Sequence, residues 1–150
     1  MPIYLDWLEQ PNEQDLVDLD KLFADAPDDW ESDNGEPLNA RWALNRLSKE
    51  RKLALGQFND RIVASAWLTK QSEGPSQPYL FKVDKLCVRA ITRKRGVAKQ
   101  LMVRLCQWAD QQQHHLFVDD QADNLSGLYE LGFVQHGKGW LYMARSTVHS

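Results

Sequence analysis

The chain contains no segment that would place it in a membrane or carry it out of the cell. No apolar run approaches the ~20 residues of a membrane-spanning helix, and residues 1–6 lack the basic and apolar regions of a signal peptide. Cysteine is scarce, and neither Cys87 nor Cys106 has the neighbouring histidine and the exposure that a catalytic thiol needs. We therefore expect a cytoplasmic protein with no membrane partner, in which both cysteines are reduced and buried.

Cations are almost absent from the first 40 residues, where Lys21 stands against twelve acids. Ten of these acids lie between residues 13 and 36, which indicates either a solvated helix face or a surface for a polyamine or a basic protein. The basic excess concentrates between Lys82 and Arg104, where it suits a phosphorylated ligand. No nucleic acid is expected as a partner, because this stretch is short, the net charge is −3, and no recognition helix or aromatic RNA-binding pattern accompanies it.

Alternating and helical apolar patterns predict a single domain over residues 1–150 with an α/β fold. We expect Asn12 to cap the first helix, Pro37 to stand in the first turn of the second, and Asn59-Asp60 to close a hairpin. The predicted strands span 3–8, 53–58, 61–69, 81–88, 115–119 and 139–144, and the predicted helices begin after 12, at 37, near 97 and at 124. Elements in this order form a mixed, mostly antiparallel sheet with helices packed on it.

The segment from Thr92 to Ala98 is a candidate phosphate-binding turn, because it follows a strand-like run and opens an amphipathic helix. A helix start leaves about four backbone N–H groups without partners, and anions bind there. Gly96 lets a phosphate approach the backbone, since it has no Cβ. The alternative is a solvated basic turn before an ordinary helix. The predicted buried face of the helix comprises Ala98, Leu101, Met102, Leu105, Cys106 and Ala109.

The pattern Arg93-x-x-Gly96-x-Ala98 resembles the pyrophosphate-binding turn of the GNAT acetyltransferases, and the element order resembles the GNAT fold over essentially the whole chain. That fold implies a central sheet of about six to seven strands flanked by about four helices. A narrower resemblance, to the PanZ (PanM) family, is carried by residues 13–21, 58–61, 83–97 and 131–133. Members of that family are GNAT-fold acetyl-CoA sensors that bind the aspartate 1-decarboxylase precursor and promote its self-cleavage to the pyruvoyl enzyme.

The resemblance also implies how acetyl-CoA or CoA is bound. The fourth and fifth strands of such a sheet splay apart, so residues 86–88 would pair with the pantetheine arm as an added strand does, and residues 92–99 would bind the pyrophosphate. Gln121 would replace an asparagine that many members place before the last helix, because its amide offers the same donor and acceptor. The implied set is Leu86, Cys87, Val88, Thr92, Arg93, Lys94, Arg95, Gly96, Val97, Ala98, Lys99 and Gln121.

The catalytic groups that the resemblance implies are incompletely present. Active GNAT enzymes often place an acidic tyrosine four residues before the glycine of the Leu-Gly-Phe turn, where this chain has Leu128. Tyr129 lies one residue later, about 100° further around a helix. It is a candidate acid if the turn is shifted, and otherwise an amphipathic side chain packed on the sheet. Asp84 is the candidate base, the alternative being a solvated residue beside Lys82 and Lys85.

The remaining polar and aromatic candidates have ordinary explanations. The histidines at 114, 115, 136 and 149 have no metal-ligand spacing, so we expect surface histidines and no metal. Trp30 and Trp42 flank the acidic loop, where they line an acceptor pocket or a protein interface, or else belong to the core.

Two functions are compatible with these features. The first is a regulatory protein in which bound acetyl-CoA orders a surface that engages the decarboxylase precursor. The second is an acetyl-CoA-dependent N-acetyltransferase acting on a small amine or a protein amino group. The resemblance to the PanZ family and the displaced Tyr129 favour the first, whereas the intact turn and the acidic loop favour the second.

Overall fold

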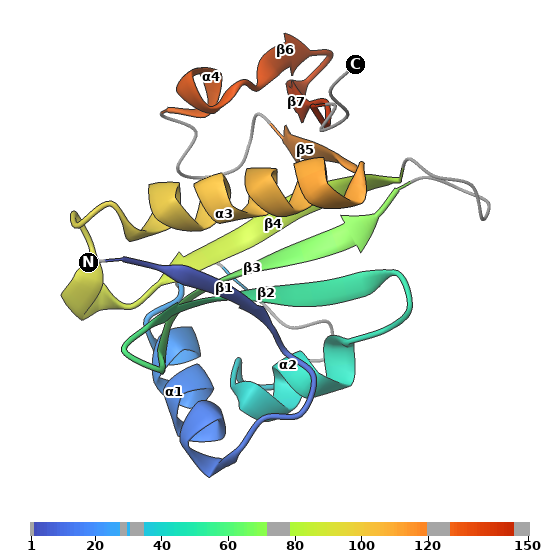
Figure 1. The fold of residues 1–150 in the computed structure, drawn as a ribbon. Helices are drawn as coiled ribbons and strands as arrows, with labels where there is room; N and C mark the ends of the chain where they lie inside the picture. The colour runs from blue at the N-terminus through green and yellow to red at the C-terminus, as the bar shows by residue number, and fades with distance from the viewer. Residues whose placement is uncertain (1, 28–29, 31–34, 72–78, 120–126, 146–150) are drawn as a thin grey trace.

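The computed structural model describes residues 2–27, 30, 35–71, 79–119 and 127–145. These residues form one seven-stranded sheet in the order β1-β2-β3-β4-β5-β7-β6, with α1 and α2 on one face and α3 on the other (Figure 1). All neighbouring strands are antiparallel except β4 and β5. The predicted fold class, mixed α/β with a mostly antiparallel sheet, is confirmed.

The elements follow the predicted order closely. The strands are β1 (Tyr4–Trp7), β2 (Arg51–Phe58), β3 (Arg61–Lys70), β4 (Leu80–Val88), β5 (His115–Asp119), β6 (Val134–His136) and β7 (Gly139–Tyr142). The helices are α1 (Glu13–Ala24), α2 (Ala40–Arg46), α3 (Val97–Gln112) and α4 (Leu128–Leu131), with a 3-10 turn η1 (Ala90–Thr92). The predicted strands did not include β6, because its three residues are all exposed and show no alternation.

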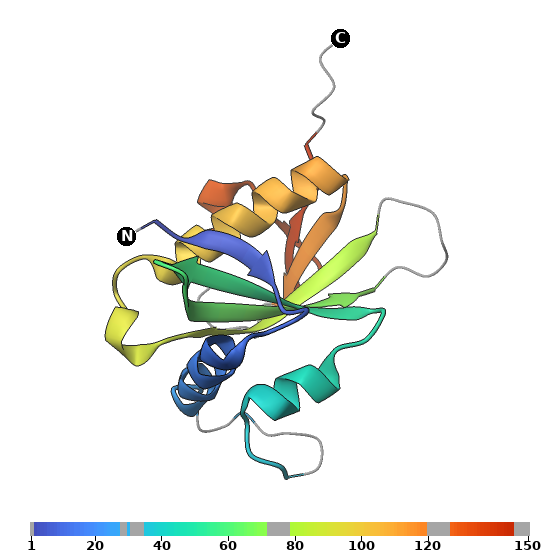
Figure 2. The ribbon, with the colours of Figure 1, turned by 60° about the horizontal axis from the view of Figure 1, so that its bottom comes forward.

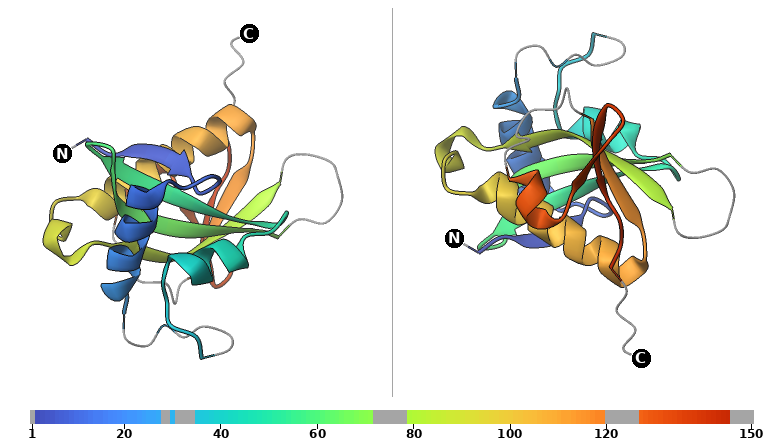
Figure 3. Two further views of the ribbon diagram at one scale, coloured as in Figure 1. Left: turned by 90° about the horizontal axis from the view of Figure 1, so that it is seen from below. Right: turned by 90° about the horizontal axis from the view of Figure 1, so that it is seen from above.

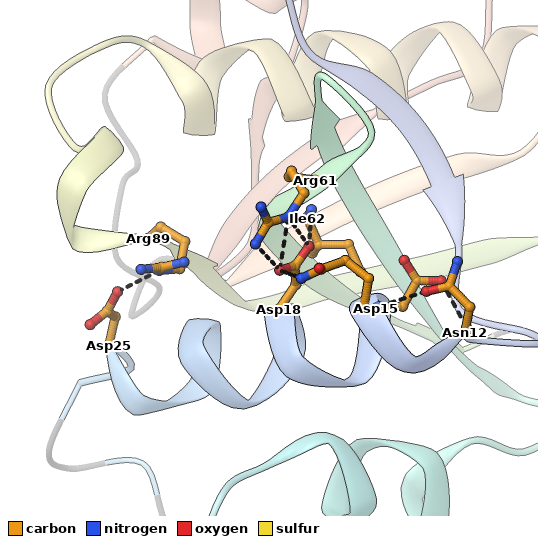
Figure 4. Close-up of polar contacts among 8 residues, drawn as sticks. Asn12, Asp15, Asp18, Asp25, Arg61, Ile62 and Arg89 are labelled. Atoms are coloured by element: carbon orange, nitrogen blue, oxygen red, sulfur yellow. Dashed lines mark hydrogen bonds and ion pairs between the residues drawn. The ribbon is translucent and has the colours of Figure 1, made fainter.

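Two local predictions are confirmed by hydrogen bonds and dihedral angles. The Asn12 side chain accepts the Asp15 N–H at 2.8 Å, and the Asp15 carboxylate accepts the Asn12 N–H at 3.1 Å, which closes a capping box at the start of α1 (Figure 4). Asn59 and Asp60 have φ values of 50° and 63°, the left-handed pair that a two-residue hairpin turn requires.

The second helix was expected to run from Pro37 to near residues 49–51, and both limits were wrong. α2 begins at Ala40, because the Asn39 side chain accepts the Trp42 N–H at 2.9 Å and so caps the helix there. Pro37 therefore precedes the helix instead of standing in its first turn. The helix ends at Arg46, since Leu47 is already extended. The predicted start of the last helix at 124 lies outside the described residues.

The core has one part on each face of the sheet. α3 covers the first part, but Val97, not the predicted Ala98, takes the buried position at the start of the helix. α1 and α2 cover the second part, where the Trp42 ring packs edge-on against Phe23 and Trp67. Figure 3 shows these two helices on the opposite side of the sheet from α3. Trp42 is thus a core residue.

His114 is buried, contrary to the expected surface position. Its ring stacks on Tyr79 and packs against Phe81 and Trp108, and its Nδ1 accepts the Tyr79 N–H at 3.4 Å. Burial and the nearby cation Lys52 lower the pKa of this imidazole, so the neutral ring is an aromatic core residue. His115 is half-buried, His136 is exposed, and His149 lies outside the described residues.

A buried carboxylate connects α1 to the β2–β3 hairpin. Asp18 is 1% exposed and accepts hydrogen bonds from the Arg61 guanidinium at 2.7 Å and the Ile62 N–H at 3.1 Å (Figure 4). Gln14 donates a third at 2.9 Å. Burial opposes the charged form, but these donors outweigh it and lower the pKa of Asp18 from its ordinary value of 3.8.

Replacement of Asp18 by asparagine is expected to lower the free energy of unfolding by about 2–3 kcal/mol at neutral pH, because an amide is a weaker acceptor for a guanidinium. Since the folded pKa is lowered, the carboxylate stabilises the fold above its ordinary pKa, and this contribution is lost as the pH falls through the folded pKa. The difference between wild type and Asp18→Asn should therefore shrink in acid. Urea unfolding of both proteins at neutral and acidic pH checks this, and a constant difference would contradict it.

Candidate ligand-binding site

The sheet opens along one edge of β4. β4 pairs with β5 only from Leu80 opposite His115 to Lys82 opposite Phe117, although β4 itself continues to Val88. β4 remains paired with β3 further along, where Val88 lies opposite Ala64. The far half of β4 therefore leaves the parallel ladder, as the resemblance predicts, and β4 and β5 diverge (Figure 2), so that no described strand pairs with its amides on the β5 side.

Just before this opening, a β-bulge in β4 changes the face of the sheet to which the following side chains point. Ser65 lies opposite Cys87 and Trp67 opposite Asp84, so β4 contains one more residue than β3 across this segment. Lys85, inside the bulge, has a φ of 50°. As a result Val83 packs in the core part under α3, whereas Cys87 packs in the part under α1 and α2. Regular alternation would put both on one face.

A basic turn joins β4 to α3. It contains η1 and then the exposed residues 93–96, and Gly96 takes a left-handed φ of 74°. The first hydrogen bond of α3 runs from the Gln100 N–H to the Gly96 carbonyl at 3.0 Å. The amides of Val97, Ala98 and Lys99 precede it, and in the described part of the chain they donate to no protein group. They are unpartnered amides of a helix start, the kind of group to which anions bind, and anion binding here stays a prediction.

Asp25, the residue that follows α1, holds this turn in place. The Asp25 carboxylate accepts the Arg89 guanidinium at 3.0 Å and the Ala90 N–H at 2.9 Å (Figure 4). Arg93 donates to the Asp25 carbonyl oxygen. The hydrogen bond from Ala90 and the Arg89 charge hold the pKa of Asp25 below its ordinary value. The ion pair is partly buried, at 19% and 26% exposure, so solvent screens it less than a surface pair.

Two clefts meet at the end of β4. The larger, which we name the α1 cleft, has a volume of about 960 Å³ and lies between the end of α1, β4 and the turn. The smaller, the α4 cleft, has a volume of about 500 Å³ and lies between the start of α3 and α4. Both are lined by Leu86, Lys94, Gly96 and Ala98, so they meet at the free amides of α3.

The structure brings most of the predicted binding residues together. The α1 cleft is lined by Leu86, Cys87, Val88, Thr92, Arg93, Lys94, Gly96, Val97 and Ala98. Lys99 lines the α4 cleft. Arg95 is exposed and lines neither of these two clefts, and Gln121 lies outside the described residues.

Sequence patterns did not reveal two further segments that line the clefts. Ala24, Asp25, Ala26 and Pro27 line the α1 cleft, and four residues at α4, including Glu130, line the α4 cleft. Both segments reach the turn from distant parts of the chain, so no local spacing indicates them. The density of acids near Asp25 was the only available signal, and it did not distinguish this carboxylate from its neighbours.

The candidate catalytic residues differ sharply in position. Tyr129 is 77% exposed and lines neither cleft, whereas Leu128 is buried and lines the α4 cleft. Asp84 is only half-buried, but its Oδ1 is enclosed and has no hydrogen-bond partner among the described residues. It is therefore not the solvated strand residue that was the alternative to a base. The Trp30 ring lies 5.7 Å from the Lys85 ammonium, next to Asp84 in sequence.

The cysteines offer no nucleophile at neutral pH. Burial raises the pKa of the Cys87 thiol to about 11 and that of Cys106 to about 12, and the Cys87 Sγ donates to the Leu22 carbonyl oxygen at 3.4 Å. Within the described residues no group of three metal-ligating side chains comes together, and no helix is both long and apolar enough to cross a bilayer. What the site offers is free amides and cations for an anion, beside an open strand edge.

Comparison with known proteins identifies relatives of this arrangement. A family model described as the acetyltransferase (GNAT) domain PanZ matches residues 2–135, while the comparison with curated proteins found no match. Among solved structures, YhhK from E. coli, determined with coenzyme A bound, is 20% identical over 96% of this chain and 100% of its own, with a TM-score of 0.59. The ribosomal-protein-S18-alanine N-acetyltransferase from E. coli is 15% identical over 99% of both chains, with a TM-score of 0.60. These structures establish the likeness of fold, and because the family model spans most of the sequence, this chain belongs to the PanZ family of GNAT acetyltransferase domains.

Proposed function

We propose that the protein is an acetyl-CoA sensor that promotes maturation of the aspartate 1-decarboxylase precursor. One observation carries the proposal: the free amides of α3 lie where the two clefts meet, beside the edge of β4 that β5 leaves, and among the described residues no tyrosine lines either cleft. The first two features suit a phosphopantetheine ligand. The third suits binding without group transfer.

The ligand is expected to bind along the turn and the open strand. Its pyrophosphate would accept from the amides of Val97, Ala98 and Lys99, next to the cations of the 93–96 turn. The pantetheine amides would pair with the backbone of residues 86–88, with which no described strand pairs on the β5 side. The presence of coenzyme A in the structure of YhhK, a protein of the same fold, supports this placement.

The sensor function is supported by what lies at the reacting end. A transferase needs a proton donor for the departing thiolate, but a leucine, Leu128, lines the α4 cleft where active relatives are expected to have tyrosine. The Tyr129 hydroxyl is exposed to solvent and not to either cleft. Membership of the PanZ family supports the decarboxylase precursor as the partner.

One observation favours the alternative of an active N-acetyltransferase. The enclosed Asp84 Oδ1 has no partner in the described structure, and Asp84 lies at the bulge just before the open edge of β4. A buried carboxylate oxygen without a donor is costly to maintain, which suits a group that accepts a proton or an ammonium from a substrate. Acetyl transfer to an amine that is lost in Asp84→Asn would establish this alternative.

Replacement of Gly96 by alanine is expected to weaken CoA binding by at least about tenfold, since the new methyl group stands between the phosphate and the amides and each lost contact to a charged group costs ~1.5–3 kcal/mol. Gly137→Ala is the matched control: both glycines have positive φ, 74° and 58°, and neither would-be Cβ meets an atom within 4 Å. Both variants should therefore lose similar stability. Calorimetric titration with CoA should separate them, and equal affinities would contradict the placement.

Asp25→Asn is expected to weaken CoA binding by about three- to tenfold, because it loosens the charged contact to Arg89 that positions the turn. Asp20→Asn is the control on the same helix, since Asp20 accepts the Ala40 N–H at 2.8 Å and lines neither cleft. Both variants should show lower melting temperatures, but only Asp25→Asn should change the dissociation constant. A loss of affinity in both would mean that general destabilisation, not positioning, is responsible.

The sensor function predicts thermodynamic coupling between ligand and partner. Acetyl-CoA should bind more tightly when the decarboxylase precursor is present, and the precursor should bind more tightly by the same factor when acetyl-CoA is present. Titration calorimetry in both orders measures the two factors, with CoA as the comparison ligand. Tyr129→Phe should leave binding and precursor cleavage unchanged, because its hydroxyl lies outside both clefts. Acetyl-CoA binding that is indifferent to the precursor would rule out the sensor function and leave the transferase.

A further inference from the structure

The two walls of the α4 cleft are joined by a single ion pair. Lys99, on the first turn of α3, and Glu130, on α4, both line the cleft, and the Lys99 Nζ lies 3.1 Å from the Glu130 Oε2. Within the described residues this is the only polar contact between the two helices. Both side chains are largely exposed, at 57% and 68%, so the pair can open without disturbing the core.

Glu130 is the only acid among the described residues that line this cleft, which otherwise carries the cations Lys94 and Lys99. Lys99 also carries one of the three free amides at the start of α3. One of the two cations that line this cleft beside the predicted phosphate position is thus already paired with a carboxylate. An incoming phosphate must both take Lys99 from Glu130 and approach the Glu130 charge.

We infer that Glu130 is a competing anion that sets the affinity of the site for phosphorylated ligands. The inference rests on the proposed CoA-binding function and deepens it, because a sensor must release its ligand below a threshold concentration. With no ligand, Glu130 occupies Lys99. With ligand bound, Lys99 contacts a phosphate and Glu130 is released to solvent. The carboxylate thereby lowers the affinity without contributing any contact to the bound state.

The test is a double-substitution cycle in the full chain. CoA is titrated calorimetrically into wild type, Glu130→Gln, Lys99→Gln and the double variant, at low and at high salt. Glu130→Gln should tighten CoA binding by about two- to fivefold, the range that an exposed ion pair can contribute, and the gain should shrink at high salt. In the Lys99→Gln background the same substitution should give a smaller gain, because no ion pair remains to be broken.

Glu9→Gln is the matched control, since Glu9 is exposed, lies between β1 and α1 and lines neither cleft. It should leave CoA affinity unchanged. All variants should melt within about 2 °C of wild type, as exposed substitutions usually do. Far-UV circular dichroism provides an independent check that each variant is folded.

The outcomes separate this inference from the proposed function. If wild type binds CoA and Glu130→Gln binds it equally or more weakly, the inference is overturned while the proposed function stands. Equal gains in the wild-type and Lys99→Gln backgrounds overturn the competition for Lys99, because repulsion between Glu130 and the ligand would then explain the whole effect. Wild type that binds no CoA overturns the proposed function and this inference with it.

Discussion

The site depends on one constraint in the sheet: β4 must pair with β3 along almost its whole length but with β5 over only three residues. Among the described strands, the divergence leaves backbone N–H and C=O groups at the centre of the sheet without a ladder partner, which is costly where they are buried. The clefts at the end of β4 give these groups access to solvent or a ligand. The bulge at Lys85 moves the Cys87 side chain to the α1 face. The neighbouring Leu86 and Val88 pack against the core part under α3.

Much of this arrangement could be predicted from local patterns. The Asn12 cap and the Asn59-Asp60 turn each depend on neighbouring residues alone, and the predictions for them are confirmed for that reason. Five of the six predicted buried positions of α3 are confirmed, and only the first is wrong, because the helix begins in a phase that places Val97 and not Ala98 against the sheet. That phase makes Ala98 a lining residue of both clefts, not a core residue.

What sequence could not predict depends on contacts between distant residues. Asp25 and Arg89 are 64 positions apart, and Asp18 and Arg61 are 43 apart, so no spacing within either element indicates these pairs. His114 is buried because aromatic rings from β4 and α3 and the residue before β4 enclose it, although its sequence neighbourhood is polar. In each case tertiary packing selects one polar residue out of several similar ones.

The two ion pairs at the ends of the site differ in how firmly they are held, and burial explains the difference. Asp25 and Arg89 are mostly shielded from solvent, and Asp25 also accepts a backbone N–H, so this pair is a permanent part of the turn and its net charge does not oppose a phosphate. Lys99 and Glu130 are mostly exposed and share one contact, which solvent and salt weaken. In the proposed function, a negatively charged ligand would therefore meet a fixed wall on the α1 side and a displaceable charge on the α4 side. The α1 side would hold the turn that receives the ligand, and the α4 side would lower the affinity for it.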